Sequence, residues 1–432
     1  MNFEDSLKYL LSPGNEVLTM KLGLENIGKL LAALGNPQNN YYKVQVAGTN
    51  GKGSTCGFIE GVCRSARLRT GVLTSPHLVS ITERIRIDGR DISEEDFARH
   101  ATKIRETSEK LVAEGELESA PTFFEQVTAI GLYAFAEAGV ELAILETGLG
   151  GRLDATTAAN AEIAVITSID FDHQAILGDT IEKIAEEKAA IIRSDSRVAA
   201  APQKPEAARV IERVCAEKGT SAVNNFRFEA TGFGFAPGQE GKIRGNFETS
   251  GSSYPDVYLG LAGRHQIENA GTAILAAELL SEKFPITPRN IISGLAMARH
   301  KGRLEFRENV LFDGAHNAAG AKALASFLEE FIGPVTLVFG AMRDKDLPEI
   351  TAALFPLAER LILTRSANER SVETAEFKKF VSGNSFVIET PTVGKALDEA
   401  FDWAAPEDII CVTGSLYLVG EAQKILNNKR YE

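Results

Sequence analysis

The chain has 432 residues, of which 44% are hydrophobic and 24% are charged, and its formal net charge is −13. This length exceeds that of one ordinary domain of about 150 residues, so it predicts two or three domains and allows a sizeable core. The excess of acidic residues argues that this protein does not bind nucleic acids or membrane surfaces, although a local basic pocket can still hold an anionic substrate.

The cysteines and the N-terminal segment indicate the cellular compartment of the protein. The four cysteines (Cys56, Cys63, Cys215 and Cys411) do not have the spacing of a metal site, and their number is typical of a reducing compartment. The first residues lack the apolar stretch of a signal peptide, and no run of about 18 apolar residues suggests a membrane span. We therefore expect a cytoplasmic protein.

The first 200 residues alternate short β-branched runs with longer amphipathic stretches. Strands are predicted at 42–48, 70–75, 141–148 and 161–169, and helices at 52–67, 93–115, 121–139 and about 180–193. Strands that alternate with helices of this length indicate a parallel sheet covered on both faces.

The pattern changes at 225–260, where alternating residues and turn glycines predict a small antiparallel insert before a helix at 265–284. From about 298, five apolar runs separated by helical stretches predict a second sheet. They lie at 310–317, 334–340, 360–365, 385–389 and 408–415. We predict an α/β protein with an N-terminal parallel-sheet domain (1–297) and a Rossmann-like, doubly wound C-terminal domain (298–432).

The strongest motif is the glycine-rich turn VAGTNGKGST, from Val46 to Thr55, between the first strand and the first helix of the sheet. Glycine lets backbone N–H groups approach a phosphate, and a helix N-terminus adds favourable partial charge. Lys52 can reach the β- and γ-phosphates, and the hydroxyl of Ser54 or Thr55 can bind Mg²⁺. The motif departs from G-x-x-x-x-G-K-[ST], because Gly53 separates Lys52 from Ser54. An ordinary glycine-rich turn is the alternative, but the strand–loop–lysine–helix order favours a P-loop in the N-terminal domain.

Acidic and histidine side chains follow two further strands of the same predicted sheet. Glu146 ends one strand, and Asp170, Asp172 and His173 follow the next. The carboxyl ends of strands face the ligand crevice in open α/β sheets, so these side chains can hold Mg²⁺. Structural hydrogen bonding is the alternative for each of them. The pattern around Lys188, within a predicted helix, favours a solvated lysine.

A second group of polar residues lies near the predicted domain boundary and beyond it. Asn269 is in HQIENA, Arg303 is in KGRLEF, and Asp313 and His316 are in FDGAHN at the end of a predicted strand. This position favours a site, and loop or capping chemistry is the alternative.

Together these segments resemble the folylpolyglutamate synthase and dihydrofolate synthase family of ADP-forming Mur ligases. The resemblance rests on GTNGKGS, TSPHL with TERIRI, ETGLGGRLDAT, DHQAILGDTIEKIAEEKAAII, HQIENA, GRLE, DGAHN and TGSLYL, and it extends from residue 23 to the C-terminus. It implies a Mg·ATP-dependent ligase in which a substrate carboxylate becomes an acyl phosphate and the amine of L-glutamate displaces the phosphate.

The resemblance also implies roles for individual residues. ATP contacts are expected from Thr49, Asn50, Gly51, Lys52, Gly53, Ser54, Asn269, Arg303 and Asp313. Magnesium ligands are expected from Ser54, Glu146, His173 and a carbamylated Lys188, and folate contacts from Ser75, Pro76, His77 and Asp154. The catalytic set is Lys52, His173, Lys188 and His316, with His316 near the glutamate-adding centre. A second Mg²⁺ and a monovalent cation are further expectations.

Three positions depart from the family pattern, namely Thr157, Lys301 and the segment Asn368–Ser371, and they bear on local substrate contacts. One alternative is a Mur-type ligase that adds an amino acid to a cell-wall precursor, but TSPHL and the extra loop glycine favour folate. Another is a nucleotide-binding regulator without turnover, against which Lys52 and Lys188 argue. We expect a monomer whose partners are its small-molecule substrates, namely folate or dihydropteroate, L-glutamate and ATP. The net charge of −13 argues against nucleic acid or a membrane as a partner.

Overall fold

A computed structural model describes residues 1–12, 23–234, 241–331, 333–381, 386–405 and 408–429. The predicted insert and the predicted strand at 385–389 each include residues outside this set, namely 235–240 and 385. The chain divides into two compact units. Unit 1 comprises Met1–Phe228, Phe247–Val257 and Glu268–Ala298, and unit 2 comprises Glu229–Asn246, Tyr258–Ile267 and Arg299–Glu432.

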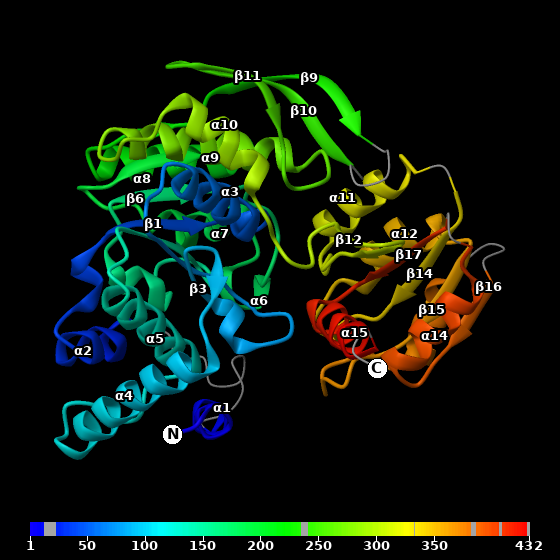
Figure 1. The fold of residues 1–432 in the computed structure, drawn as a ribbon, viewed down its shortest axis with the longest axis horizontal. Coiled ribbons are helices and arrows are strands. Elements are labelled where there is room, and N and C mark those ends of the chain that lie inside the picture. Colours follow the sequence, from blue (N-terminus) through cyan, green and yellow to red (C-terminus); the bar gives the residue numbers. More distant parts are fainter. Residues whose placement is uncertain (13–22, 235–240, 332, 382–385, 406–407, 430–432) are drawn as a thin grey trace. The chain divides into compact units, whose positions relative to one another are not determined.

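Unit 1 is built on an eight-stranded sheet with the order β4-β3-β2-β5-β1-β6-β7-β8 (Figure 1). Its strands are β1 Tyr42–Ala47, β2 Thr70–Leu73, β3 Ile85–Ile87, β4 Arg90–Asp91, β5 Leu142–Glu146, β6 Ile163–Ile166, β7 Arg197–Ala200 and β8 Ala222–Val223. The strands from β2 to β8 in this order pair in parallel, whereas β3 and β4 are antiparallel to their neighbours. The predicted parallel sheet is confirmed, and an antiparallel edge is added to it.

Helices of unit 1 cover this sheet. They are α1 Phe3–Leu11, α2 Glu25–Ala33, α3 Lys52–Ser65, α4 Glu94–Ala113, α5 Phe123–Glu137, α6 Gln174–Leu177, α7 Ile181–Ala189, α8 Pro205–Glu217, α9 Gln266–Ser281 (which begins in unit 2) and α10 Pro288–Met297. One apolar cluster packs α4 and α5 on β2 and β5, and another packs α7 and α8 on β6 and β7. The α3 and α10 backbones touch, because a Cβ at Gly61 would lie 2.3 Å from the carbonyl oxygen of Gly294. Glycine at both positions therefore seats α10 on the helix that follows the glycine-rich turn.

The predicted insert forms a three-stranded sheet with the order β11-β10-β9. Its strands are β9 Phe226–Gly234, β10 Lys242–Thr249 and β11 Ser253–Tyr258. The Thr249 N–H donates to the Ser252 carbonyl at 2.9 Å and closes the hairpin between β10 and β11. These two strands are therefore antiparallel, as predicted.

Unit 2 contains a six-stranded sheet with the order β12-β13-β17-β14-β15-β16. Its strands are β12 Glu305–Arg307, β13 Val310–Phe312, β14 Val335–Phe339, β15 Arg360–Leu363, β16 Phe386–Glu389 and β17 Ile409–Thr413. Its helices are α11 Ala318–Leu328, α12 Leu347–Leu354, α13 Thr374–Phe377, α14 Val393–Trp403 and α15 Leu416–Lys429. The five predicted strands are all present and parallel, and the unpredicted β12 is antiparallel to β13, which makes the sheet mixed.

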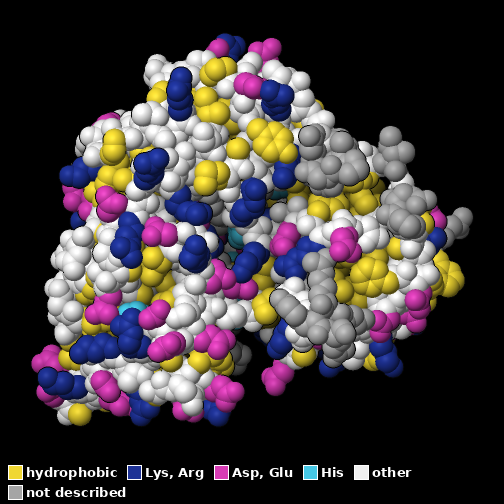
Figure 2. Space-filling model, in the orientation of Figure 1, with side chains coloured by type: hydrophobic (Ala, Val, Ile, Leu, Met, Phe, Trp, Pro, Cys, Tyr) yellow, Lys and Arg dark blue, Asp and Glu magenta, His cyan; other side chains and the backbone are white. Residues whose placement is uncertain are grey.

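Two features of the structure concern binding to nucleic acids and membranes, namely the charges on the surface and the character of the helices. Figure 2 shows Lys and Arg side chains interspersed with Asp and Glu side chains over the visible face. Among the described residues, no helix has the length and apolar character needed to cross a bilayer.

Candidate active site

The glycine-rich turn between β1 and α3 is held to the segment that follows β6. The Thr49 N–H donates to the Ser168 carbonyl at 2.9 Å, and the Thr49 hydroxyl donates to the Asp170 carbonyl at 2.9 Å. β1 lies between β5 and β6 in the sheet, and Val46 is in register with Glu146. The sheet therefore brings the carboxyl ends of three neighbouring strands together, as the sequence predicted.

Gly51 makes the turn possible. It caps α3 with a φ of +85°, and a Cβ at this position would lie 2.1 Å from the Asn269 side-chain oxygen. Asn269 is itself buried, so it cannot move aside easily. A glycine is therefore required at position 51 both for the backbone conformation and for the close approach of Asn269, which places the predicted Asn269 against the loop.

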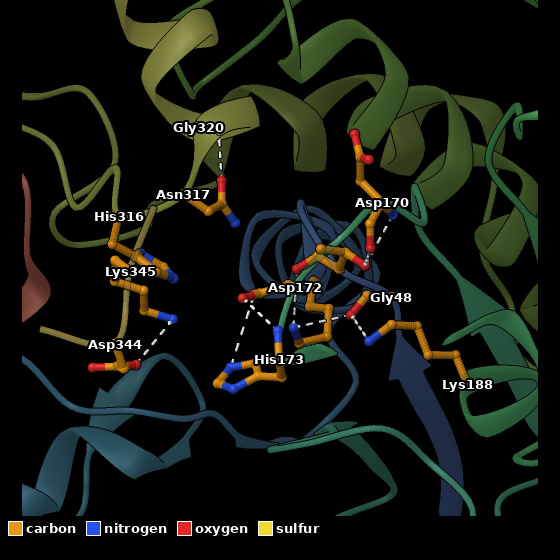
Figure 3. A network of polar contacts seen from close by, with 12 residues as sticks. Gly48, Asp170, Asp172, His173, Lys188, His316, Asn317, Gly320, Asp344 and Lys345 are labelled. Carbon is orange, nitrogen blue, oxygen red and sulfur yellow. Dashed lines mark hydrogen bonds and ion pairs between the residues drawn. The ribbon is translucent and has the colours of Figure 1, made fainter. Parts of the chain in front are cut away.

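Two lysines converge on one carbonyl oxygen of the loop. The Lys188 ammonium, on α7, donates to the Gly48 carbonyl at 2.9 Å, and the Lys52 ammonium donates to the same oxygen at 3.1 Å. Figure 3 shows the Lys188 side chain directed at Gly48. Lys188 is only 4% exposed. Burial, followed by the charge of Lys52, lowers the pKa of Lys188 to about 7. The interpretation of Lys188 as a solvated lysine, which its pattern alone favoured, is wrong.

Polar side chains from the neighbouring strands surround this loop. Glu146 is buried at the end of β5, and its carboxylate accepts a hydrogen bond from the Ser75 N–H at 3.2 Å. Asp172 accepts from the His173 N–H at 3.0 Å, and these two side chains lie together in Figure 3. The negative charge of Asp172 also acts on Lys188 and opposes the lowering of its pKa. Asp172 therefore lies at this site, as its position after a predicted strand suggested, although the family resemblance did not name it among the magnesium ligands.

Asp154 braces the loop after β5 from within. Its carboxylate accepts hydrogen bonds from the N–H groups of Gly148 at 2.8 Å, Leu149 at 2.9 Å and Thr156 at 3.0 Å, and from the Thr156 hydroxyl. Burial raises the pKa of Asp154, and these hydrogen bonds oppose that shift. Asp154 thus gives the loop its shape through its own contacts.

A separate set of predicted residues follows β13 in unit 2. The buried Asp313 accepts from the N–H groups of Leu304 and Ala315, both at 2.9 Å. Burial raises the pKa of Asp313, and the Arg303 guanidinium opposes that shift. Arg303 also donates to the Gly314 carbonyl at 3.2 Å.

His316 and Asn317 complete this loop. The Nδ1 of His316 lies 2.7 Å from the Gly314 carbonyl oxygen. A carbonyl can only accept, so Nδ1 carries the proton and Nε2 is the acceptor nitrogen of the neutral ring. The Asn317 side chain caps α11 by accepting from the Gly320 N–H at 2.8 Å, and Figure 3 shows this contact.

The turn fits a nucleotide phosphate group. Gly48 and Gly51 permit the close packing of the turn against Thr167 and Asn269, and Lys52 supplies positive charge. Among the described residues, the buried hydroxyl of Thr55 in the first turn of α3 has no hydrogen-bond partner. Among the described residues, no three His, Cys, Asp or Glu side chains are grouped to hold a metal ion. Mg²⁺ bound with ATP takes phosphate and water oxygens as ligands, so one or two protein ligands suffice. Ser54 and Glu146 supply oxygens of the right chemistry.

Comparison with known proteins gives concordant results. The Mur ligase middle domain model matches residues 46–277, and the Mur ligase glutamate ligase domain model matches residues 302–416. The dihydrofolate synthase/folylpolyglutamate synthase of Bacillus subtilis is 33% identical over 417 residues, which cover 94% of this chain and 95% of that protein.

Two further likenesses add to this. A probable bifunctional folylpolyglutamate synthase/dihydropteroate synthase of Haloferax volcanii is 35% identical over 94% of this chain, and the chain spans 48% of that longer protein. The solved structure of Escherichia coli FolC in complex with DHPP and ADP is similar with a TM-score of 0.87 and 29% identity, covering 100% of this chain and 99% of that one.

Proposed function

Since the chain belongs to the dihydrofolate synthase/folylpolyglutamate synthase family of Mur ligases, we propose that it ligates L-glutamate to the carboxylate of a folate or dihydropteroate, with ATP converted to ADP and phosphate. The observation that carries the proposal is the loop after β1, where Lys52 and Lys188 meet at one oxygen beside a glycine cradle. The chain is thus an ADP-forming carboxylate–amine ligase. We propose a folate substrate for it in preference to the cell-wall precursor of the alternative hypothesis.

The chemistry requires activation of the substrate carboxylate. A carboxylate oxygen attacks the γ-phosphorus of ATP, the bond to the β-phosphate oxygen breaks, and an acyl phosphate and ADP result. The glutamate amine then adds to the acyl carbon, and the tetrahedral intermediate expels phosphate and loses a proton. Lys52 stabilises the charge on the transferring phosphoryl group, because its ammonium is held at the loop that receives the phosphates. The backbone from Thr49 to Ser54 orients them.

Magnesium is proposed to be held by the Ser54 hydroxyl and the Glu146 carboxylate, with His173 as a third ligand. When bound, it neutralises the charge that develops on the phosphate oxygens. Glu146 already accepts from Ser75, so it also joins the metal site to the start of the TSPHL loop. A second Mg²⁺ and a monovalent cation are part of the proposal, and titration of activity with each ion tests them.

Lys188 is proposed to react with CO₂ and carry a carbamate. A pKa of about 7 leaves a large fraction of neutral amine, which is the form that attacks CO₂ and then releases a proton. The product places an anionic oxygen where two ammonium groups now meet at Gly48. The modification therefore relieves like-charge repulsion with Lys52 and supplies an oxygen ligand suited to Mg²⁺.

Unit 2 is proposed to supply Arg303 and Asp313 for ATP and His316 for the glutamate step. The acceptor Nε2 of His316 suits a group that receives the proton lost by the attacking amine. Asp154 shapes the folate pocket through its loop, and Ser75, Pro76 and His77 contact the substrate. We further propose that the chain acts as a cytoplasmic monomer, with residues 1–297 and 298–432 as its two domains.

The assay measures ADP and phosphate release with L-glutamate and either dihydropteroate or a tetrahydrofolate. Release that requires both glutamate and the folate substrate is expected. Turnover of both dihydropteroate and the tetrahydrofolate indicates the bifunctional enzyme. Release of ADP and phosphate without a folate substrate, or no release at all, contradicts the proposal.

A further inference from the structure

The turn Gly302–Glu305 in unit 2 contains a bulky residue in a strained backbone conformation. Leu304 has a φ of +42°, in the left-handed region that side chains disfavour, and it is only 4% exposed. A leucine stays in this region only where the surrounding contacts hold it there, and such strain is concentrated at functional sites. The contacts that hold Leu304 therefore indicate what the turn does.

Two carboxylates hold the backbone on either side of Arg303. The Leu304 N–H donates to Oδ2 of Asp313 at 2.9 Å. The Gly302 N–H donates to Oε2 of Glu305 at 2.7 Å. Hydrogen bonds to an ionised acceptor are stronger than those between neutral groups, so the backbone of Arg303 is fixed between two strong contacts.

Glu305, the first residue of β12, is anchored at both of its oxygens. Its Oε2 also accepts from Nε2 of Gln423 at 2.9 Å, and Gln423, on α15, is 1% exposed. Its Oε1 accepts from Nε of Arg307 at 2.9 Å. The carboxylate thus joins the turn to α15 and to β12, and these contacts keep it in place as the acceptor for Gly302.

The turn directs the Arg303 guanidinium to the carboxyl end of β13. Its Nη1 donates to the Gly314 carbonyl at 3.2 Å, and the Gly314 N–H donates to the Gly302 carbonyl at 2.9 Å. The positive charge of Arg303 also acts on Asp313, at the same strand end. Ligands of open α/β sheets bind at the carboxyl ends of strands, and a guanidinium is well suited to phosphate oxygens. The guanidinium therefore lies at the end of the sheet where a ligand is expected.

We propose that Glu305 is a positioning residue, which acts with Asp313 to hold the strained turn and so fixes the Arg303 guanidinium for a phosphate of ATP. The inference rests on the proposed function, which gives Arg303 its contact with ATP. Glu305 acts through the backbone N–H of Gly302 and does not touch the nucleotide. Without this acceptor Leu304 leaves the left-handed region, and the guanidinium loses its fixed position.

The first test measures the Kd of a non-hydrolysable ATP analogue with Mg²⁺ by isothermal titration calorimetry. Glu305→Ala should raise this Kd about tenfold, as expected for the loss of one charged contact. In Glu305→Gln the amide oxygen can still accept from the Gly302 N–H, and only the ion pair with Arg307 is lost. Its Kd should therefore rise less than about twofold. An equal rise in both variants, or no rise in Glu305→Ala, overturns the proposal.

Arg307→Met is the matched control, because it removes the same ion pair from the other side and leaves the bond between Gly302 and Glu305 in place. Its Kd should stay within about twofold of that of the unaltered chain, and a rise equal to that of Glu305→Ala overturns the proposal. If Glu305→Ala does not fold, Gln423→Met decides, because it frees the Glu305 carboxylate from α15. A rise of about threefold is then expected, and an unchanged Kd overturns the proposal.

The second test determines whether Glu305 acts through Arg303. Arg303→Met should raise the KM for ATP, and Glu305→Ala added to it should change this KM less than about twofold, because the residue to be positioned is gone. The KM for the folate substrate should stay the same in each variant. Independent structural roles give additive effects, so additive effects on the KM for ATP overturn the proposal.

The calorimetry also separates this inference from the proposed function. If the unaltered chain binds the ATP analogue but ligates glutamate to no folate, the proposed function fails, whereas the Kd values of the variants still decide the role of Glu305. If the chain ligates glutamate and the variants bind the analogue equally well, only the role of Glu305 is refuted. A chain that does not bind the analogue contradicts both.

Discussion

The loops after β1 and after β13 hold their functional residues in opposite ways. The loop after β1 is tied to distant segments, because Thr49 bonds residues 168 and 170 and Lys188 reaches Gly48 across 140 positions of sequence. The side chains of the loop after β13 have local partners, because the Asp313 carboxylate and the His316 ring bond backbone groups at most nine positions away. The Asp313 N–H donates to the Val412 carbonyl on the neighbouring strand β17. The first loop also concentrates positive charge, whereas the second pairs Arg303 with Asp313.

This difference indicates which of the two loops is suited to the transfer of the phosphoryl group. Two ammonium groups at one buried oxygen are unfavourable unless an anion joins them, so the loop after β1 is poised for phosphate. The side chains of the loop after β13 are held mainly by nearby backbone groups and lack the second ammonium group found in the first loop. We therefore expect substitutions in the first loop to abolish turnover and those in the second to weaken it.

Lys52→Ala should produce the largest effect. It removes the ammonium that faces the transferring phosphoryl group, and kcat should fall about 100- to 1000-fold with the fold retained. Steady-state kinetics with circular dichroism measures both. A folded variant with near-normal turnover would show that the loop after β1 is not the phosphate site.

Lys188→Ala should lose most activity and regain part of it with added acetate or formate. The vacated space beside Gly48 and Asp172 suits a small anion that replaces the carbamate. Lys183→Ala is the matched control on the same helix, because Lys183 is exposed and pairs with Asp179. A carbamate is also expected in ¹³C NMR with labelled bicarbonate. Full activity of Lys188→Ala without a carboxylate, or equal rescue of both variants, would refute carbamylation.

Gly51→Ala tests the close packing of the first loop. The new methyl group would collide with Asn269, and the φ of +85° is strained for alanine, so the free energy of unfolding of unit 1 should fall by about 2–4 kcal/mol. KM for ATP should rise as well. Gly35→Ala is the control, because Gly35 has a φ of +82° with nothing within 4 Å of the added methyl group.

Denaturant unfolding distinguishes the two glycine variants. Gly35→Ala should lose only the backbone contribution of about 1–2 kcal/mol and keep its KM for ATP. Equal losses of stability in both variants would show that Asn269 does not restrict position 51.

Asp313→Asn should have the smallest effect on turnover. The amide nitrogen cannot accept from Leu304 or Ala315, so one hydrogen bond is lost, and kcat/KM for ATP should fall about tenfold. Asp408→Asn is the control within unit 2, because Asp408 is also buried and accepts from the Ala405 N–H at 2.9 Å. Equal loss of activity in both variants would mean that Asp313 serves only stability.

The sequence predicted the elements that have clear periodicity. The strands around Val46, Leu145 and Val165 and the helix beginning at Lys52 were identified because buried parallel strands and a glycine-rich turn leave strong signals. β3, β4, β8 and β12 were missed because strands of two or three residues show little alternation, and the four-residue β7 was missed as well. β13 also has three residues, but it was predicted because it lies in a longer apolar run. The motifs also predicted that Glu146 and Lys52 would lie at one edge of the sheet.

Contacts between distant side chains could not be read from the sequence. The burial of Lys188 depends on tertiary packing, and a charged residue in a helix or loop is ordinarily solvated. The role of Asp154 within its own loop also depends on contacts that no spacing reveals. The charge interaction between Asp172 and Lys188 depends on the tertiary structure too, whereas the position of Asp172 after a strand was predicted. Long-range hydrogen bonds to backbone carbonyls and N–H groups were thus the part that only the structure could supply.

The most direct test of the central claim follows the oxygen atoms of the substrate carboxylate. A dihydropteroate or tetrahydrofolate labelled with ¹⁸O in that carboxylate is turned over with ATP and L-glutamate, and the released phosphate is analysed by mass spectrometry or ³¹P NMR. Attack of the carboxylate on the γ-phosphorus and later cleavage of the acyl C–O bond transfer one labelled oxygen per turnover, so phosphate carrying one ¹⁸O is expected alongside ADP. Unlabelled phosphate, or AMP in place of ADP, would contradict the acyl-phosphate ligase.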